Sequence, residues 1–161
     1  YPRLTARENI VYYGRLHGMS AAAASGRADA LAHMLDMAPL LERRTEGFSQ
    51  GERMKTALAR ALVHNPPNII LDEPTNGLDV LATRALRDAL RRLRDDEGKC
   101  IVFSTHIMQE VERLCDQVIV VSHGRTVAEG SVAALNALCG ERDFEESFVK
   151  LAFSVDERRR A

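Results

Sequence analysis

Residues 68–79 read Asn-Ile-Ile-Leu-Asp-Glu-Pro-Thr-Asn-Gly-Leu-Asp. The run of apolar residues at its start is typical of a short strand that is buried on both faces of a parallel sheet. We therefore predict a strand over residues 68–72, which ends at the adjacent acids Asp72 and Glu73. The carboxyl edge of such a sheet is where open α/β folds bind their ligands.

Two adjacent carboxylates at a strand end are costly unless a positive charge lies nearby. A Mg²⁺ ion bound to nucleotide phosphates is a natural partner, because this ion prefers carboxylate, phosphate and water oxygens. One of the two acids could then hold the ion, and the other could orient and deprotonate an attacking water. The alternative is a solvated acidic pair in a loop.

The composition limits the classes of protein to consider. The chain has 161 residues, of which 45% are hydrophobic and 28% charged, as in an ordinary globular domain. Its net charge of −1 gives no general attraction to nucleic acid or to an anionic membrane. The three cysteines show no Cys-x-x-Cys spacing, which indicates reduced thiols. No apolar run approaches the ~20 residues of a spanning helix.

The order of predicted elements indicates an α/β fold. Residues 5–45 contain helical patterns without strands, whereas strands and helices alternate between residues 68 and 121, which predicts a parallel sheet. A turn at His123-Gly124 leads into one more strand. We predict a helical subdomain, a sheet-containing core and a helical tail, which cover residues 1–47, 48–130 and 131–161.

A second candidate segment, Phe48-Ser49-Gln50-Gly51-Glu52, opens a predicted helix. Ser49 and Glu52 have the spacing of a capping box, as do Thr5 and Glu8 at the first predicted helix. A small hydroxyl, a glycine and free backbone N–H groups at a helix N-terminus can bind an anion. The alternative is a helix cap without a ligand.

Two further residues join these candidates. His106 closes the Ser-Thr-His run that follows the second predicted strand, over residues 100–104. Because adjacent parallel strands end at the same edge, His106 could lie near Asp72 and Glu73 and contact a phosphate; a structural histidine is the alternative. Asp79 suits the N-cap of the next helix. This capping role does not prevent the residue from having a functional role as well.

Taken in order along the chain, these segments resemble the ATP-binding cassette (ABC) family over nearly the whole sequence. The resemblance implies an α/β fold, with a P-loop NTPase-like parallel sheet, flanking helices and an α-helical subdomain. Within the family, the motifs are most similar to the ATP-binding subunits of sodium-type exporters, the NatA-like group. The matching motifs are the signature loop (Phe48–Glu52), the Walker B strand (Ile69–Glu73), the D-loop (Asn76–Asp79) and the switch histidine (His106).

The resemblance also implies roles for these residues in a head-to-tail dimer of two ATPase subunits with two ATP molecules between them. Asp72 would hold Mg²⁺, Glu73 would polarise the attacking water, and His106 would bind the γ-phosphate. Asp79 would link the two sites across the interface. The nucleotide-contacting positions of the signature loop would be Ser49, Gln50, Gly51 and Glu52.

The implied partners are a second ABC ATPase subunit and an integral membrane permease, at the cytoplasmic face of the cell membrane, and no nucleic acid. ATP hydrolysis would drive export, with Na⁺ as one possible cargo. Two alternatives stay open at this point. One is a soluble ABC-type ATPase that acts on DNA or ribosomes, and the other is a non-enzymatic cassette remnant that pairs with another cassette.

The sequence departs from the family pattern in two ways. The common signature is Leu-Ser-Gly-Gly-Gln, so that Gln50 replaces a glycine and Glu52 replaces a glutamine. Glu52 would place an acid near the phosphates unless its side chain turns away to cap the helix. In addition, no Gly-x-x-x-x-Gly-Lys-Ser/Thr loop occurs in the 161 residues. We therefore expect an N-terminally truncated piece that binds ATP weakly or not at all and does not hydrolyse it alone.

Overall fold

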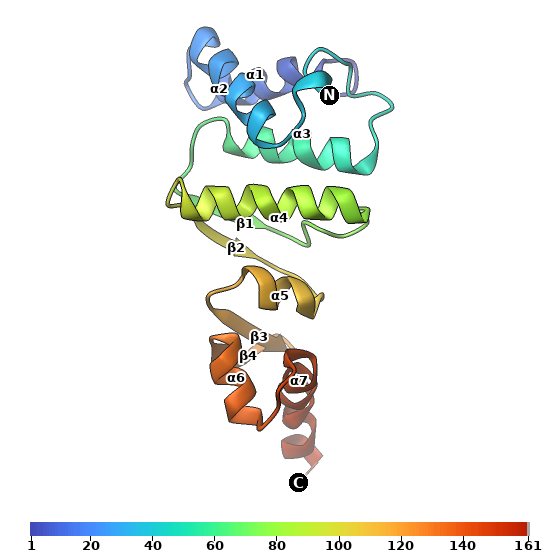
Figure 1. Cartoon of the computed structure of the whole chain (residues 1–161), viewed down its shortest axis with the longest axis vertical. Helices are drawn as coiled ribbons and strands as arrows, with labels where there is room; N and C mark the ends of the chain where they lie inside the picture. The colour runs from blue at the N-terminus through green and yellow to red at the C-terminus, as the bar shows by residue number, and fades with distance from the viewer. Residues whose placement is uncertain (161) are drawn as a thin grey trace. The chain divides into compact units, whose positions relative to one another are not determined.

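The computed structural model of the chain describes residues 1–160, with side chains up to residue 153. It divides into two compact units, Tyr1–Ser104 and the residues from Thr105 onward. The first unit contains helices α1 to α4 with strands β1 and β2, and the second contains α5 to α7 with β3 and β4 (Figure 1). The division predicted from the sequence, at residues 47 and 130, stays a prediction.

The N-terminal part of the first unit is helical, as predicted for residues 5–45. Reciprocal hydrogen bonds join Thr5 to Glu8 at the first helix and Ser49 to Glu52 at the third, so that both predicted capping boxes are confirmed. Each box satisfies backbone N–H groups that a helix start would otherwise leave unpaired. The helices are α1 (Ala6–Leu16), α2 (Ala21–Met34), a 3₁₀ turn η1 (Ala38–Leu40) and α3 (Gln50–Leu62).

A close approach between these helices occurs at Gly14 of α1, which is buried. A Cβ atom at this position would lie 2.8 Å from the Cβ atom of Ala24 in α2 and 3.1 Å from Val63, just after α3. Carbon atoms cannot approach so closely without a shift of one of the helices. The absence of a side chain at Gly14 therefore sets the spacing of α1, α2 and α3.

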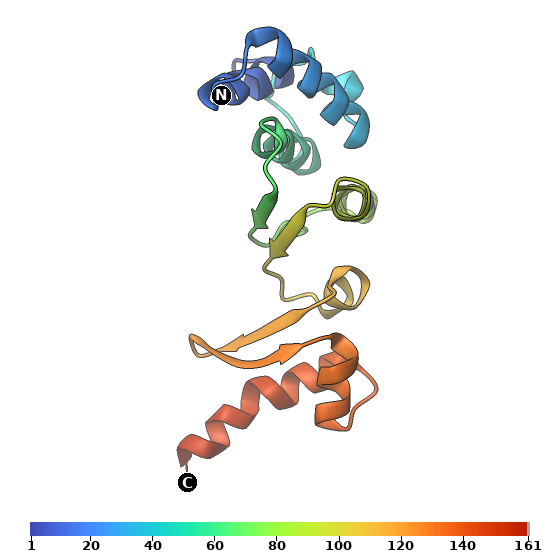
Figure 2. The same cartoon turned by 90° about the vertical axis from the view of Figure 1, so that its left-hand side faces the viewer.

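The predicted β-α-β unit is present in the first unit. Strand β1 runs parallel to β2, with Ile69 opposite Ile101, and Figure 2 shows the two strands side by side. Helix α4 connects them and is capped by Asp79, whose carboxylate accepts a hydrogen bond from the Ala82 N–H at 2.8 Å. The bounds are β1 (Asn68–Leu71), α4 (Val80–Asp95) and β2 (Cys100–Phe103).

Two details predicted for the first strand are wrong. It ends at Leu71 and not at residue 72. It is also not buried on both faces, because Ile70 is 83% exposed and Val102 on β2 is 58% exposed, while Ile69 is buried. Side chains alternate between the faces of a strand. In the described residues, one face of the pair is therefore packed and the other is open to solvent.

The second unit contains an antiparallel hairpin. Strand β3 (Val118–Ser122) pairs with β4 (Arg125–Gly130) and, within the described part of the chain, with no other strand. The prediction that the strand at residues 118–121 continues the parallel sheet is therefore wrong here. The predicted turn at His123-Gly124 is confirmed, with positive φ at both residues, and such a turn brings consecutive strands together.

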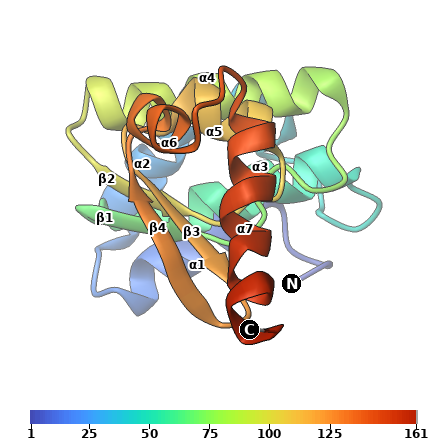
Figure 3. The same ribbon diagram turned by 90° about the horizontal axis from the view of Figure 1, so that it is seen from below.

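Three helices complete the second unit, and Figure 3 shows the last of them beside the hairpin. Apolar side chains of the hairpin and helices form one core around Val120, Leu135 and Phe144. Among the helices that the structure describes, none combines the length and the apolar character needed to cross a membrane. The helices are α5 (Met108–Leu114), α6 (Val132–Cys139) and α7 (Phe144–Arg160).

Candidate functional site

The carboxyl ends of β1 and β2 bring Asp72, Glu73 and Ser104 together. The Ser104 hydroxyl donates a hydrogen bond to Asp72 Oδ1 at 2.5 Å and accepts one from the Glu73 backbone N–H at 2.9 Å. One hydroxyl thereby orients the carboxylate of Asp72 and the backbone of Glu73. No role was predicted for Ser104 itself, because its contact with Asp72 depends on the register of the two strands.

The backbone at Glu73 adopts an unusual conformation, with φ of 44°. Such left-handed conformations are uncommon outside glycine and concentrate at functional sites, where neighbouring contacts hold them in place. Here the chain turns at once, since the Asn76 N–H donates to the Glu73 carbonyl at 3.0 Å and the Leu78 N–H to the Thr75 carbonyl at 3.2 Å. The position of Glu73 is therefore tied to this turn.

The oxygens at this strand end fit a Mg²⁺ ion. The Asp72 side chain is exposed, and the Ser104 hydroxyl orients it. No cluster of three or more His, Cys, Asp or Glu side chains that could hold a metal occurs among the residues described. Mg²⁺ needs no such cluster, because it is commonly held by one or two carboxylates, with phosphates and water in the other positions. Asp72 is thus suited to this ion when a phosphate is also present.

Glu52 in the second candidate segment is directed toward the start of α3. Its carboxylate accepts a hydrogen bond from the Ser49 backbone N–H at 2.8 Å and pairs with Arg43 at 3.0 Å. The hydrogen bond from the Ser49 N–H, which has the larger effect, and the pairing with Arg43 lower the pKa of Glu52. The capping role considered from the sequence is confirmed, and a contact between Glu52 and a nucleotide stays a prediction. The pairing with Arg43 has no signal in the sequence.

The stability of the chain is expected to depend on Glu52 in a specific pH range. A carboxyl group whose pKa is lower in the folded than in the unfolded state stabilises the fold above its ordinary value, 4.5, and loses this effect as the pH falls below it. Glu52→Gln keeps the capping geometry and removes the charge. We expect the variant to be less stable than the parent at pH 7, with the difference shrinking toward pH 3, in urea unfolding followed by circular dichroism. A difference that does not change with pH would contradict this role.

The segments predicted as two separate motifs, residues 48–52 and 76–79, lie next to each other. The Gln50 side-chain amide donates a hydrogen bond to the Asn76 carbonyl at 3.0 Å. A Cβ atom at Gly51 would lie 3.2 Å from the Cβ atom of Ala82 in α4. The starts of α3 and α4 are therefore close together, an arrangement that the sequence did not reveal.

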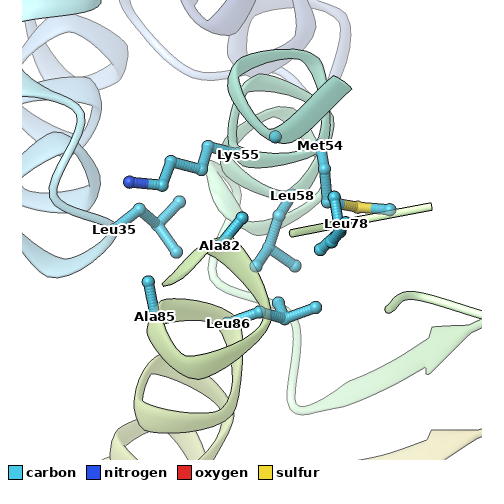
Figure 4. Close-up of a pocket in the computed structure, with 9 residues that line it drawn as sticks. Leu35, Met54, Lys55, Leu58, Leu78, Ala82, Ala85 and Leu86 are labelled. Carbon is cyan, nitrogen blue, oxygen red and sulfur yellow. The ribbon is translucent and has the colours of Figure 1, made fainter. Parts of the chain in front are cut away.

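A shallow apolar recess lies beside this contact, between α3 and α4. Figure 4 shows Leu58 of α3 and Leu86 of α4 facing each other across it, with Leu35 and Lys55 at one side. Burial of such side chains stabilises the packing of the two helices. The buried leucines beside the recess thus help to hold α3 against α4.

His106 belongs to the second unit. It lies just before α5 and is exposed. Its predicted place beside Asp72 and Glu73 stays a prediction.

Known proteins are similar to this chain in sequence and in fold. The family described as "ABC transporter" matches residues 1–76. The "ABC transporter ATP-binding protein NatA" of Bacillus subtilis is 42% identical over 135 residues, which cover 84% of this chain and 54% of that protein. The "Nod factor export ATP-binding protein I" of Burkholderia lata is 41% identical over 134 residues, 83% of this chain and 44% of that protein. The chain belongs to the ABC transporter family of ATP-binding proteins.

A similar solved structure supports the assignment to this family. It is described as the ATP binding subunit of an ABC transporter and superposes with a TM-score of 0.79 at 30% identity, covering 94% of this chain and 63% of the other. The mixed α/β fold is therefore that of an ABC ATP-binding subunit. The chain spans about half the length of the curated ABC relatives named above.

Proposed function

We propose that the chain carries the hydrolytic part of an ABC exporter's ATP-binding subunit, which couples ATP hydrolysis to transport. The observation that supports this most is the network of Asp72, Glu73 and Ser104 at the end of the parallel pair. It places a candidate Mg²⁺ ligand next to a candidate base, in the same unit as the helix start at Ser49. The relatives' names, which refer to ABC transport and export, agree with this function.

In this proposal, the side chains at the strand end act on the ATP phosphates and on water. Asp72 holds Mg²⁺, with Ser104 orienting its carboxylate. When bound, the ion neutralises charge on the phosphates. Glu73 orients the attacking water and accepts its proton. His106 contacts the γ-phosphate.

The signature segment acts across a dimer in this proposal. The Ser49 and Glu52 N–H groups are taken up by the capping box, so the anion site is formed by the N–H groups of Gln50 and Gly51 in the first turn of α3. The start of a helix favours an anion such as the γ-phosphate held by the second subunit. Asp79 connects the two sites.

The second partner is a permease in the membrane, which would place the chain at the cytoplasmic face and would select the cargo, Na⁺ among the candidates. No relative named above is described as acting on DNA or ribosomes.

The test is the Mg²⁺ dependence of ATP hydrolysis by a protein that combines these residues with a phosphate-binding loop, in the same chain or from a partner. Asp72→Asn removes the charge that attracts the ion, and we expect the Mg²⁺ concentration for half-maximal hydrolysis to rise by about 10-fold or more. Asp88→Asn, on the exposed side of α4, is the matched control and should leave the Mg²⁺ dependence unchanged. An unchanged value for Asp72→Asn would refute the assignment of this residue.

A further inference from the structure

The Gln50 side-chain amide already has a hydrogen-bond partner within the chain and does not depend on a nucleotide for one. Its nitrogen lies 3.0 Å from the Asn76 carbonyl oxygen. A carbonyl oxygen only accepts hydrogen bonds, so the nitrogen end of the amide must face it. The amide group also lies close over Gly77, where a Cβ atom would be 2.4 Å from Gln50 Nε2 and 3.0 Å from Cδ.

The turn that Gln50 contacts is also the turn that holds Glu73. The peptide between Asn76 and Gly77 accepts the Gln50 hydrogen bond, and the Asn76 N–H donates in turn to the Glu73 carbonyl. Gly77 has φ of 69°, a conformation that glycine adopts without strain and that lets the Gln50 amide approach. Two hydrogen bonds therefore join the start of α3 to the backbone of the candidate base.

We propose that Gln50 is a positioning residue that fastens the signature segment, Phe48–Glu52, to the turn at Asn76-Gly77 and thereby to Glu73. The role rests on the proposed function, because it connects the part of the chain that contacts one nucleotide with the base that acts on another. A movement of the start of α3 is transmitted to the backbone of Glu73 through the backbone of Asn76, whose carbonyl accepts one hydrogen bond and whose N–H donates the other. The family pattern has a glycine at position 50, which has no side chain for such a link.

The link can be tested in the 161-residue chain without ATP. Gln50→Met keeps the length of the side chain and removes the donor, whereas Gln50→Lys keeps a donor that can reach the same carbonyl. We expect amide hydrogen exchange at Asn76 and Leu78, followed by NMR, to become about three-fold faster in Gln50→Met and to return toward the parent rate in Gln50→Lys. Gln109→Met, at an exposed position of α5, is the control and should change neither rate.

Gln50→Glu serves as a second variant if Gln50→Met fails to fold, because glutamate has the same shape and is ionised at pH 7. It should show the same faster exchange. Equal exchange rates in the parent, Gln50→Met and Gln50→Glu would overturn the link.

A second measurement separates positioning from nucleotide binding in a preparation that hydrolyses ATP. For a positioning residue, Gln50→Met should lower kcat about three-fold with an unchanged KM for ATP, and Gln50→Lys should restore kcat. A raised KM with an unchanged kcat would instead make Gln50 a nucleotide contact and overturn the positioning role. If the chain does not hydrolyse ATP even when it is combined with a phosphate-binding loop, the proposed function fails, whereas the exchange rates still decide whether the link exists.

Discussion

Replacing Glu73 with glutamine is expected to lower the rate of ATP hydrolysis on the order of 1000-fold, because a positioned general base contributes roughly 10²–10⁴-fold. Glutamine has the same shape as glutamate but cannot accept the proton of the attacking water. The backbone N–H of residue 73 can still donate to Ser104, so the turn and the Asp72 carboxylate should keep their positions. Binding of ATP should therefore be nearly unchanged.

The measurements are kcat at saturating ATP and the affinity for an ATP analogue, in the preparation that combines these residues with a phosphate-binding loop. Glu112→Gln, an exposed glutamate of α5, is the matched control and should keep the parent values. A Glu73→Gln protein that hydrolyses ATP within about 10-fold of the parent would exclude Glu73 as the base. Loss of analogue binding would instead point to a disturbed turn.

Features with local signals were predicted well from the sequence. The caps at Thr5, Ser49 and Asp79 follow from side chains that bond to a backbone N–H three residues away, so a few letters of sequence specify them. The parallel pairing of β1 with β2 follows from the strand-helix-strand order. These local rules were enough to place Asp72 and Glu73 at the end of a strand.

Side-chain contacts between distant segments were not predictable. The contact of Ser104 with Asp72 requires the register of two strands, and that of Gln50 with Asn76 requires the packing of α3 against α4. The exposure of Ile70 shows the same limit, because an apolar run predicts a strand but does not say how many of its faces are covered. The roles of the site residues stay predictions as well, because they depend on contacts with a nucleotide that a sequence pattern does not specify.

Gly14→Ala is expected to lower the free energy of unfolding by about 1–3 kcal/mol, the usual effect of adding a methyl group to a well-packed core. The new Cβ atom would lie 2.8 Å from that of Ala24 and 3.1 Å from Val63, so α1 must move away from α2 and α3. Alanine is the better helix former by about 1 kcal/mol, so the steric effect must exceed this gain for the variant to be less stable. Urea unfolding of the 161-residue chain, followed by circular dichroism, measures the difference.

Gly26→Ala serves as the control and is expected to raise the free energy of unfolding instead of lowering it. Gly26 also lies inside a helix, α2, but a Cβ atom there would have no neighbour within 4 Å. Only the helix preference remains, and we expect a gain of about 0.5–1 kcal/mol. Adding Ala24→Gly to Gly14→Ala should recover part of the lost stability, because it removes the nearest clash. Equal stability of the two single alanine variants would mean that the three helices adjust freely, and that Gly14 does not set their spacing.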